Sequence, residues 1–257
     1  MTTTPETAET VARARSLVQA AERITVLTGA GISTDSGIQD FRGPNGLWTK
    51  NPEAEKMATL SYYLSDPEIR RRAWRNRLES PTWTAEPNAG HRALVELEVQ
   101  GKLVLLITQN VDGLHLDAGT SRERLVEIHG TMREVGCLSC GERAPMERAL
   151  ARVEAGEDDP PCRSCGGILK SATISFGQNL VERDLLMAEV GARSCDLLLA
   201  VGSTLSVYPA AAVVPTARSN GAKVVIVNGQ PTDMDDLADV VVRGSISEVL
   251  PTIVEPS

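Results

Sequence analysis

The sequence lacks the features that mark membrane, secreted and nucleic-acid-binding proteins. It has no apolar run of about 18 residues that could span a bilayer. Its first residues, MTTTPETAET, lack the basic start and the apolar core of a signal peptide. It also has no block of Lys or Arg, and its net charge is −8, so non-specific binding to nucleic acid is disfavoured. We therefore expect a cytoplasmic globular protein with no membrane or nucleic-acid partner.

Cysteine is scarce as well, with five residues in the chain. In a reducing compartment, so few cysteines favour a metal site over a disulfide framework. Four of them form two C-x-x-C pairs, each followed closely by glycine, so that four thiolates can point at one ion. Such a shell is closed, which favours one structural Zn ion over a catalytic one. The predicted ligands are Cys137, Cys140, Cys162 and Cys165.

Short apolar runs alternate with helical stretches along most of the chain. Continuous apolar strands separated by helices predict an α/β fold with a doubly wound, Rossmann-like parallel sheet and a ligand crevice at the carboxyl ends of its strands. Cys195, beside one of these runs, is expected to be a small buried side chain. We expect strands at 24–27, 103–107, 125–128, 197–201, 224–227 and 240–242, and helices at 8–21, 89–100, 181–192 and 210–220.

Two segments interrupt the alternation. Residues 43–87 are charged and helical in tendency, and residues 130–170 contain the cysteine pairs. We expect these insertions to form a second, smaller lobe with a helical part and a zinc-binding part. The larger lobe would then comprise about 8–42, 88–129 and 171–253.

A Gly-rich turn, GAGISTDSGIQDFRG, follows the first apolar run. Such a turn after a strand usually holds the phosphates of a dinucleotide. Here Thr34 stands at the position of the third glycine, and Asp40-Phe41-Arg42 follows where a helix would ordinarily continue. The turn therefore predicts a dinucleotide site that differs from that of an ordinary dehydrogenase.

Polar side chains also follow four later strands of the predicted sheet. Residues 109–113 read Gln-Asn-Val-Asp-Gly, a cluster that taken alone is more often a turn or an N-cap than a site. His129 ends the third strand, where it could be a general base or a structural residue. His91 is expected to be structural, and His115 to brace a turn. Glycine, hydroxyl and amide residues suited to a nucleotide follow the next two strands, at Gly202, Ser203, Thr204, Asn228 and Gly229.

Taken in order, these motifs resemble those of the sirtuins, which are NAD-dependent protein lysine deacylases. The matching stretches are GAGISTDSGIQDFRG, TQNVDGLHLDAG, EIHG, the paired C-x-x-C, ISFGQ, LAVGSTLSVYPAA and VNGQPT, and they extend over about residues 22–253. The resemblance implies a single catalytic domain over the chain, with NAD as a consumed co-substrate and acyl-lysine proteins or peptides as partners. Acyl-CoA synthetases are frequent clients of bacterial-type members.

The resemblance also implies the role of each matching residue. His129 would be the general base, with Asn110 beside it in catalysis. Residues implied to bind NAD are Gly29, Ala30, Gly31, Thr34, Asp40, Phe41, Arg42, Trp48, Gln109, Asn110, Asp112, Gly202, Ser203, Thr204, Asn228 and Gly229. Residues implied to bind the acyl-lysine peptide, which would add as a strand, are Val111, Phe176, Gly177, Val207 and Tyr208.

In the implied reaction, the acyl oxygen of the modified lysine attacks C1′ of the ribose as nicotinamide leaves, giving an alkylimidate. His129 then deprotonates the ribose hydroxyls so that the 2′-oxygen attacks this imidate, and water releases lysine and O-acyl-ADP-ribose. Mono-ADP-ribosyl transfer is the alternative enzymatic function. A zinc-ribbon module that senses NAD is the alternative outside enzymes, although His129, Asn110 and Asp112 speak against it.

Four departures from the family pattern concern loops and the acyl group. Gln39 and Ser171 stand where proline is usual, and Gln178 stands where an acidic residue is usual. We expect the loop at Gln39 to be more mobile without the fixed φ of proline. Family members that remove succinyl groups carry Tyr-x-x-Arg, whereas this chain has Trp74-Arg-Asn-Arg77. This pair is either a carboxylate clamp or part of a packed helix, and we favour acetyl-lysine as substrate.

Overall fold

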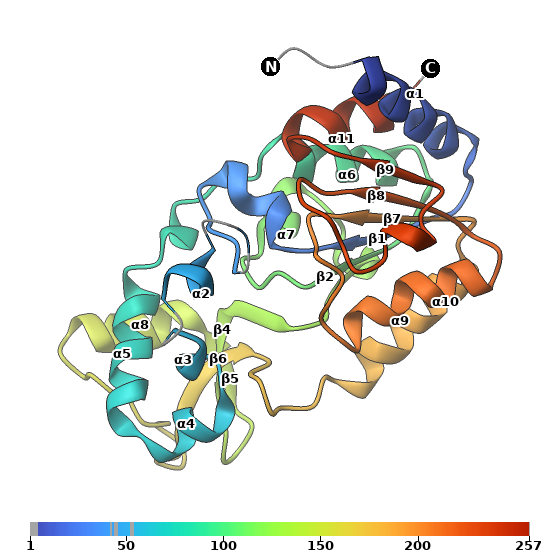
Figure 1. The fold of residues 1–257 in the computed structure, drawn as a ribbon. Coiled ribbons are helices and arrows are strands. Elements are labelled where there is room, and N and C mark those ends of the chain that lie inside the picture. The colour runs from blue at the N-terminus through green and yellow to red at the C-terminus, as the bar shows by residue number, and fades with distance from the viewer. Residues whose placement is uncertain (1–4, 42, 44–45, 52–53, 257) are drawn as a thin grey trace.

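A six-stranded parallel sheet dominates the computed structural model, which describes residues 5–41, 43, 46–51 and 54–256 (Figure 1). Its strand order is β3-β2-β1-β7-β8-β9, and every neighbouring pair is parallel. The predicted parallel sheet is thus confirmed, with strand ends that shift by one residue at most. The strands are β1 Ile24–Thr28, β2 Leu103–Thr108, β3 Leu125–Glu127, β7 Leu197–Val201, β8 Lys223–Val227 and β9 Val240–Val242.

Helices cover both faces of this sheet. On one face pack α1 (Pro5–Ala20), α6 (Ala89–Val99) and α11 (Ile246–Val254), whose apolar residues join those of the strands in one core. On the other face pack α9 (Glu182–Ser194) and α10 (Val213–Ser219), which form a second core. Because both faces are covered, the strands are apolar at almost every position, which is why the sequence shows continuous runs rather than alternation.

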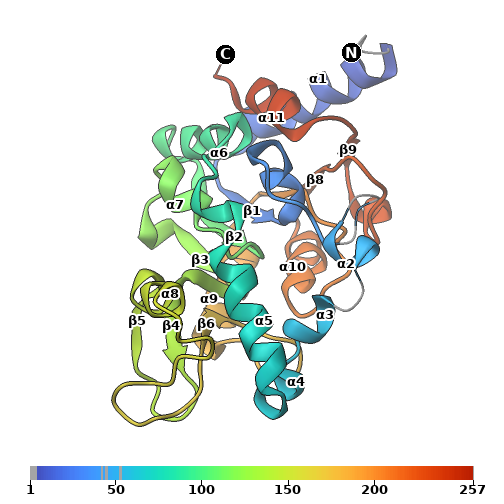
Figure 2. The same ribbon diagram turned by 90° about the vertical axis from the view of Figure 1, so that its left-hand side faces the viewer.

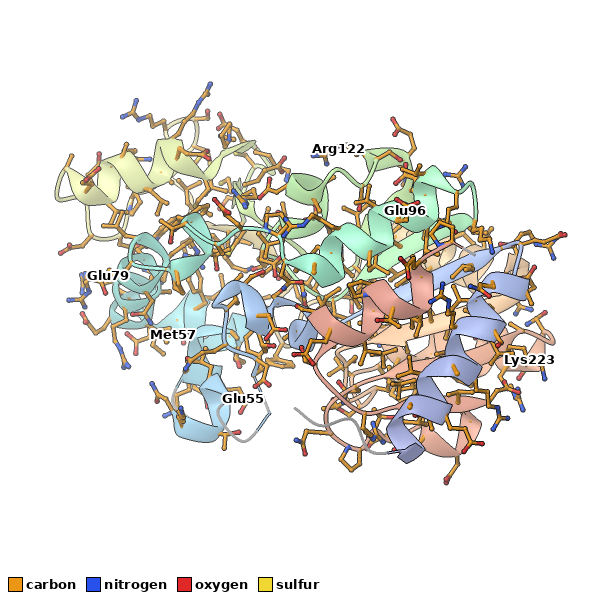
Figure 3. The ribbon with its side chains drawn as sticks, turned by 90° about the horizontal axis from the view of Figure 1, so that it is seen from above. Glu55, Met57, Glu79, Glu96, Arg122 and Lys223 are labelled. Carbon is orange, nitrogen blue, oxygen red and sulfur yellow. The ribbon has the colours of Figure 1, made fainter. Side chains whose placement is uncertain are left out.

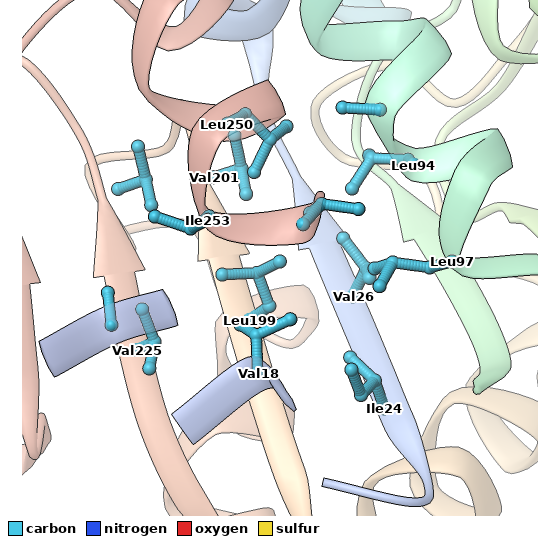
Figure 4. Packing of buried hydrophobic residues seen from close by; sticks show 14 of the residues in the cluster. Val18, Ile24, Val26, Leu94, Leu97, Leu199, Val201, Val225, Leu250 and Ile253 are labelled. Atoms are coloured by element: carbon cyan, nitrogen blue, oxygen red, sulfur yellow. The ribbon is translucent and has the colours of Figure 1, made fainter. Parts of the chain in front are cut away.

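Alternate residues of each strand enter opposite cores. In β1, Ile24 and Val26 belong to the core on the side of α1, α6 and α11, where Val26 lies beside Leu97 (Figure 4). Leu27, the next residue, belongs to the core on the α9 side. Each such side chain contributes about 1.5–3 kcal/mol when fully buried. Charged side chains such as Glu79, Arg122 and Lys223 lie instead at the periphery (Figure 3).

The centre of the sheet is a topological switch point. β1 lies between β2, which follows it through α6, and β7, which follows much later in the chain. The connections that leave the carboxyl ends of β1 and β7 therefore diverge, and a crevice opens between them. This is where the Gly-rich turn and residues 202–204 were expected to meet.

A smaller antiparallel sheet lies beside the helical insertion (Figure 2). Its strands are β4 (Gly130–Cys137), β5 (Arg143–Pro145) and β6 (Leu169–Thr173), in the order β5-β4-β6. The sequence did not predict these strands. They pack with α8 (Met146–Glu154) and α5 (Pro67–Leu78) around a third core. The short helices α2 (Leu47–Lys50), α3 (Ala54–Met57) and α4 (Leu60–Ser65) precede α5. The predicted boundaries of the two lobes stay a prediction.

Two further expectations were wrong in detail. His115 lies in a short helix, α7 (Leu114–Ala118), and not in a turn. The predicted helix over 210–220 begins as a 3₁₀ turn before α10, a common start for a helix.

Cys195 is buried as expected. No helix in the described ranges has the length and apolar character to cross a membrane. The other 3₁₀ segments are Ala30–Ser36, Pro81–Trp83, Arg122–Arg124 and Asp235–Leu237.

Candidate active site

A cavity of about 690 Å³ opens at the carboxyl ends of the parallel strands. Residues that follow β1, β2, β3, β7 and β8 all line it, so the five predicted strand ends do converge on one space. Of the predicted site residues, those lining this cavity are Gly29, Ala30, Gly31, Asp40, Phe41, Gln109, Asn110, Val111, His129, Phe176, Gly177, Gly202, Ser203, Thr204, Val207, Tyr208 and Asn228.

The remaining predicted residues fall into three groups. Asp112, Thr34 and Gly229 belong to the same loops without lining the cavity. Trp74 and Arg77 lie in the smaller lobe, as described below. Arg42 and the side chain of Trp48 lie outside the part of the chain that the structure describes.

The Gly-rich turn is held against the loop after β7. Gly29 N–H donates to Val201 O at 2.9 Å, and Gly31 N–H donates to Gly202 O at 2.8 Å. A Cβ atom on Gly31 would lie 2.8 Å from the Cα atom of Gly202, so only glycine permits this approach. Thr34 Oγ1 donates to Gly31 O at 2.9 Å, which closes the turn where a third glycine was expected. The turn is thus rigid and leaves its backbone close to the cavity.

His129 is oriented by a backbone contact. Its Nδ1 lies 3.0 Å from Gln109 O, and because a carbonyl only accepts, Nδ1 must carry the hydrogen. The neutral ring then has its lone pair on Nε2, as a general base requires. Ile174 N–H donates to His129 O at 2.7 Å, which fixes the backbone of the histidine to the segment after β6.

A buried hydrogen-bond network lies behind Asn110. Ser33 Oγ donates to Asp112 Oδ2 at 2.8 Å and accepts from Asn110 Nδ2 at 3.1 Å. Leu114 N–H donates to Asp112 Oδ1 at 2.9 Å. Burial raises the pKa of Asp112, and the hydrogen bonds from Leu114 and Ser33 act against that rise. This end of the site therefore presents a carboxyl group in fixed orientation.

Ser33 is a residue that sequence reasoning missed, since it was one unremarked position within the Gly-rich motif. His91, expected to be structural, lies next to it. His91 Nδ1 accepts from Asn88 N–H at 3.3 Å in a capping box of α6, and His91 Nε2 lies 3.5 Å from Ser33 Oγ. The only sequence signal for this contact would have been the N-cap Asn88, which fixes where the ring points.

Two buried and uncharged histidines, His91 and His115, pack beside this network. The ring centroids of His91 and His115 lie 4.9 Å apart. Burial lowers the pKa of His91 to about 4 and that of His115 to about 3, so neither is charged near neutral pH. His115 Nε2 lies 2.9 Å from Thr28 Oγ1, which donates to Thr108 Oγ1 at 2.8 Å. His115 therefore braces the ends of β1 and β2, consistent with its expected bracing role.

Another part of the cavity wall is built by Ser203 and the loop after β8, with Gln109 in contact with Ser203. Gln109 Nε2 donates to Ser203 Oγ at 2.9 Å. Arg243, which was not predicted, donates to Asn228 O at 3.1 Å and to Gln230 O at 2.6 Å. Gln230 also lines the cavity. A guanidinium group thus holds the loop that carries the predicted nucleotide-binding amide.

Two aromatic side chains mark the open side of the cavity. Phe176 is 38% exposed and Tyr208 is 63% exposed. Phe176 N–H donates to Ala58 O at 2.8 Å, and Leu60 N–H donates to Phe176 O at 3.0 Å. The expectation that a peptide pairs with exposed backbone here is therefore wrong for Phe176, because Ala58 and Leu60, at the start of α4, already bond both groups. The expected pairing of the peptide with Gly177 stays a prediction.

Trp74 and Arg77 lie away from the cavity. Trp74 on α5 is fully buried in the core of the smaller lobe, and the Arg77 guanidinium lies 5.0 Å from the centroid of its ring. Arg77 donates to Ser171 Oγ at 3.0 Å, and its burial lowers its pKa. Neither side chain is among the described residues that line the cavity. The structure therefore favours the packed-helix interpretation over a substrate-binding pair.

The four predicted zinc ligands come together in the smaller lobe. Their Sγ atoms all lie within 4.8 Å of one another. Two of the separations are 3.5 Å, between Cys137 and Cys165, and 3.8 Å, between Cys140 and Cys162. A tetrahedral ZnS₄ centre with bonds of about 2.3 Å has edges of about 3.8 Å. The cluster therefore fits a structural zinc ion, and none of its cysteines lines the cavity.

Comparisons with known proteins identify the family. Residues 29–209 match the Sir2 family. The chain is 52% identical to NAD-dependent protein deacetylase 2 of Streptomyces coelicolor over 230 residues, which cover 90% of this chain and 95% of that protein. It is 40% identical to NAD-dependent protein deacylase 2 of Archaeoglobus fulgidus, with 95% of each chain covered.

Solved structures agree with this identification. One from a study of the mechanism and regulation of Sir2 enzymes superimposes with a TM-score of 0.87 at 40% identity, covering 96% of both chains. Another, a Sir2 enzyme with a deacetylated peptide and 3′-O-acetyl-ADP-ribose, has a TM-score of 0.87 at 33% identity and covers 95% of this chain and 96% of that one. The chain belongs to the Sir2 family, the sirtuins that its motifs resemble.

Proposed function

We propose that this protein is an NAD-dependent protein lysine deacetylase, which transfers the acetyl group of acetyl-lysine to ADP-ribose and releases nicotinamide. The observation that carries the proposal is the orientation of His129. Its Nδ1–H is bound by Gln109 O, and the ring lines the same cavity as the Gly-rich turn. A base with a directed lone pair would serve no purpose in a module that only senses NAD.

The proposed binding mode follows the order of the strand ends. The diphosphate of NAD lies against Ala30 and Gly31, and the adenosine half lies toward Ser203 and Asn228. The nicotinamide ribose contacts Gln109 and Asn110, and Asp112 accepts from the carboxamide of nicotinamide. The acetyl-lysine enters from the open side, between Phe176 and Tyr208. Asp112 follows Val111, which lines the cavity, and Ser33 and Leu114 fix its carboxyl group next to that wall.

The proposed chemistry begins when the acetyl oxygen attacks C1′ of the ribose. A C–O bond forms, the bond between C1′ and nicotinamide breaks, and its electron pair leaves with nicotinamide. His129 Nε2 takes the proton of a ribose hydroxyl, so that the 2′-oxygen attacks the imidate carbon. Water then yields lysine and O-acetyl-ADP-ribose. The amide oxygen is a poor nucleophile, so its alignment with C1′ in a cavity that excludes water provides much of the rate enhancement.

A preference for acetyl over succinyl rests on the charges around the cavity. Its described lining contains no Lys or Arg side chain, and Arg77 binds Ser171 instead. Among these described lining residues, a succinyl carboxylate would find no cation to compensate for its lost hydration, at a cost of several kcal/mol. Neutral acyl groups avoid this penalty. Two solved relatives were studied with an acetylated and a propionylated peptide, respectively.

Three finer statements belong to the same proposal. The partners are acyl-lysine proteins or peptides, including acyl-CoA synthetases, and the protein acts in the cytoplasm. The zinc ion, held by the four cysteines, would stabilise the fold of the smaller lobe and take no part in chemistry, because four thiolates leave no open position on the metal. Mono-ADP-ribosyl transfer is the weaker alternative, since it requires the NAD site but not His129.

Mass spectrometry of one peptide tests the proposal. The peptide is prepared with acetyl, propionyl and succinyl lysine, and each form is incubated with the protein in the presence and absence of NAD. We expect loss of the acetyl group only with NAD, with one nicotinamide and one O-acetyl-ADP-ribose formed per lysine released. An acetyl peptide that stays intact, or a peptide that gains the mass of ADP-ribose, would refute deacetylation.

A further inference from the structure

The loop of residues 111–113, which carries Asp112, is anchored to the smaller lobe by two consecutive residues of β4. Met132 N–H donates to Val111 O at 2.9 Å. Arg133 Nε donates to Asp112 O at 2.9 Å. Two adjacent carbonyl groups of the loop are therefore held by the strand that follows His129 directly. The base lies directly before this strand, and Arg133 follows it by four residues in the sequence.

Arg133 is itself held in place by its surroundings. Its Nη2 donates to Asp117 Oδ2 at 2.5 Å, on the helix that follows the loop. Its guanidinium lies 5.8 Å from the centroid of the Trp83 ring. A Cβ atom on Gly113 would lie 2.7 Å from Arg133 Nε, so the side chain occupies the space that this glycine leaves. The planar guanidinium of Arg133 donates to two acceptors and lies beside an aromatic ring, a geometry that lysine cannot reproduce.

The contact of Arg133 reaches the Asp112 carboxyl group through the backbone. Asp112 Oδ1 accepts from Leu114 N–H, and Gly113 between them has a φ of 81°. If the Asp112 carbonyl turned, the peptide unit of Gly113 would turn with it, and Leu114 N–H would move away from the carboxylate. The positive charge of Arg133 also opposes the rise that burial imposes on the pKa of Asp112.

We propose, on the basis of the function proposed above, that Arg133 is a positioning residue for the nicotinamide end of the NAD site. It is not among the described residues that line the cavity. It holds the Asp112–Gly113 peptide unit so that the Asp112 carboxylate faces the carboxamide of nicotinamide. The adenosine half of NAD lies at the other end, where Arg243 holds the loop instead, so the effect of Arg133 is confined to nicotinamide.

The test compares Arg133→Met and Arg133→Lys with Asp117→Asn, a matched control. Asp117→Asn removes the charged partner of Arg133 on the surface but leaves the bond from Nε to Asp112 O. Four quantities are measured for each protein: the KM for NAD, the inhibition constant of nicotinamide, the Kd of ADP-ribose by calorimetry, and the Tm. ADP-ribose lacks the carboxamide, so its affinity reports on the rest of the site.

For Arg133→Met we expect the inhibition constant of nicotinamide and the KM for NAD to rise by about tenfold, the equivalent of about 1.4 kcal/mol. The Kd of ADP-ribose should stay at the wild-type value. For Arg133→Lys we expect nicotinamide and NAD constants between those of the wild type and those of Arg133→Met, because an ammonium can reach one acceptor only. The Lys variant also provides the test if the Met variant does not fold. Asp117→Asn should behave as wild type in all three ligand measurements.

Two results would overturn this role. One is wild-type nicotinamide inhibition in both Arg133 variants. The other is weakening of ADP-ribose binding in parallel with nicotinamide, together with a lower Tm, which would mean that Arg133 only stabilises the fold. Wild-type protein that releases no nicotinamide from NAD and acetylated peptide would instead refute the proposed function, so the two failures are distinguishable.

Discussion

Replacing Asp112 by asparagine tests the hydrogen-bond network behind Asn110. The direction of every hydrogen in this network follows from the contacts. Burial lowers the pKa of His91 to about 4, so the ring is neutral, and its Nδ1 accepts from Asn88 N–H. His91 Nε2 therefore carries the hydrogen and points at Ser33 Oγ, which also accepts from Asn110 Nδ2. The hydroxyl hydrogen of Ser33 is thus left for Asp112 Oδ2.

An asparagine at position 112 cannot satisfy both of its neighbours. The carboxylate accepts from two donors, Ser33 Oγ and Leu114 N–H. The amide of asparagine has one acceptor and one donor, so in either orientation its NH₂ group faces another donor. The residue is only 6% exposed, and water has little access to relieve that contact. An unsatisfied buried donor costs about 1–3 kcal/mol, which corresponds to roughly 5- to 150-fold in an equilibrium constant.

We therefore expect Asp112→Asn to lower the free energy of unfolding by about 1–3 kcal/mol. The KM for NAD and the inhibition constant of nicotinamide should rise by about tenfold or more, because the carboxamide loses a charged acceptor whose hydrogen bond contributes about 1.5–3 kcal/mol. The KM for acetylated peptide should change little, because the proposed contact of Asp112 is with the carboxamide of nicotinamide and not with the peptide. The assay is the initial rate of O-acetyl-ADP-ribose formation, followed by mass spectrometry over a range of NAD concentrations. Asp117→Asn, on an exposed carboxylate nearby, is the control for loss of charge. Wild-type NAD and nicotinamide constants in Asp112→Asn would show that the network is wrongly assigned.

Four other predictions follow from the site and its supports. His129→Ala should lower kcat by about 10²–10⁴-fold while zinc content and Tm stay at wild-type values, and near-normal turnover would disprove its role as base. Cys137→Ala should release zinc, measured by atomic absorption, and lower the Tm, whereas a zinc-free variant that melts as wild type would exclude a structural metal. The pKa values of His91 and His115 are lowered by burial from 6.5 to about 4 and about 3, so the unfolded chain binds more protons below pH 6.5. Stability measured with urea should thus fall as the pH drops from about 6.5 to 4, and His91→Gln should reduce that slope; an equal slope in the variant would contradict the assignment. Arg77→Ala should leave the ratio of desuccinylation to deacetylation unchanged and lower the Tm, whereas selective loss of succinyl removal would restore the carboxylate-clamp hypothesis.

Local chemistry made much of this protein predictable from its sequence. The strands are buried on both faces, so they appear as continuous apolar runs, and such runs in alternation with helices admit only a parallel sheet with short right-handed connections. Since parallel strands end at one edge, polar residues after them had to share a crevice, and His129, Asn110 and Ser203 all line it. The zinc ligands were equally clear, because C-x-x-C spacing brings two thiolates to one turn.

The sequence does not determine which core the apolar side chains of a helix pack against. An apolar side chain on α5 is equally compatible with a cavity wall and with a packed interior, and only the tertiary structure put Trp74 in the core and Arg77 against Ser171. The antiparallel sheet was also missed, since β4 is mostly half-buried, β5 has three residues, and β6 pairs with β4 across 32 to 43 positions of the sequence. Propensity has little influence on such pairings, and packing decides them.

The residues that hold the site in place were likewise found only in the tertiary structure, whereas the sequence named the site residues themselves. Motif positions were sufficient to name Asp112 and His129, because a residue at a strand end is placed by its own strand. Ser33 and Arg133 contact Asp112 across 79 and 21 positions of the sequence, and His91 contacts Ser33 across 58. Hydrogen bonds of this kind form only when the donor–acceptor distance is correct to within a few tenths of an ångström. Only the folded chain sets the distance between two elements with that precision.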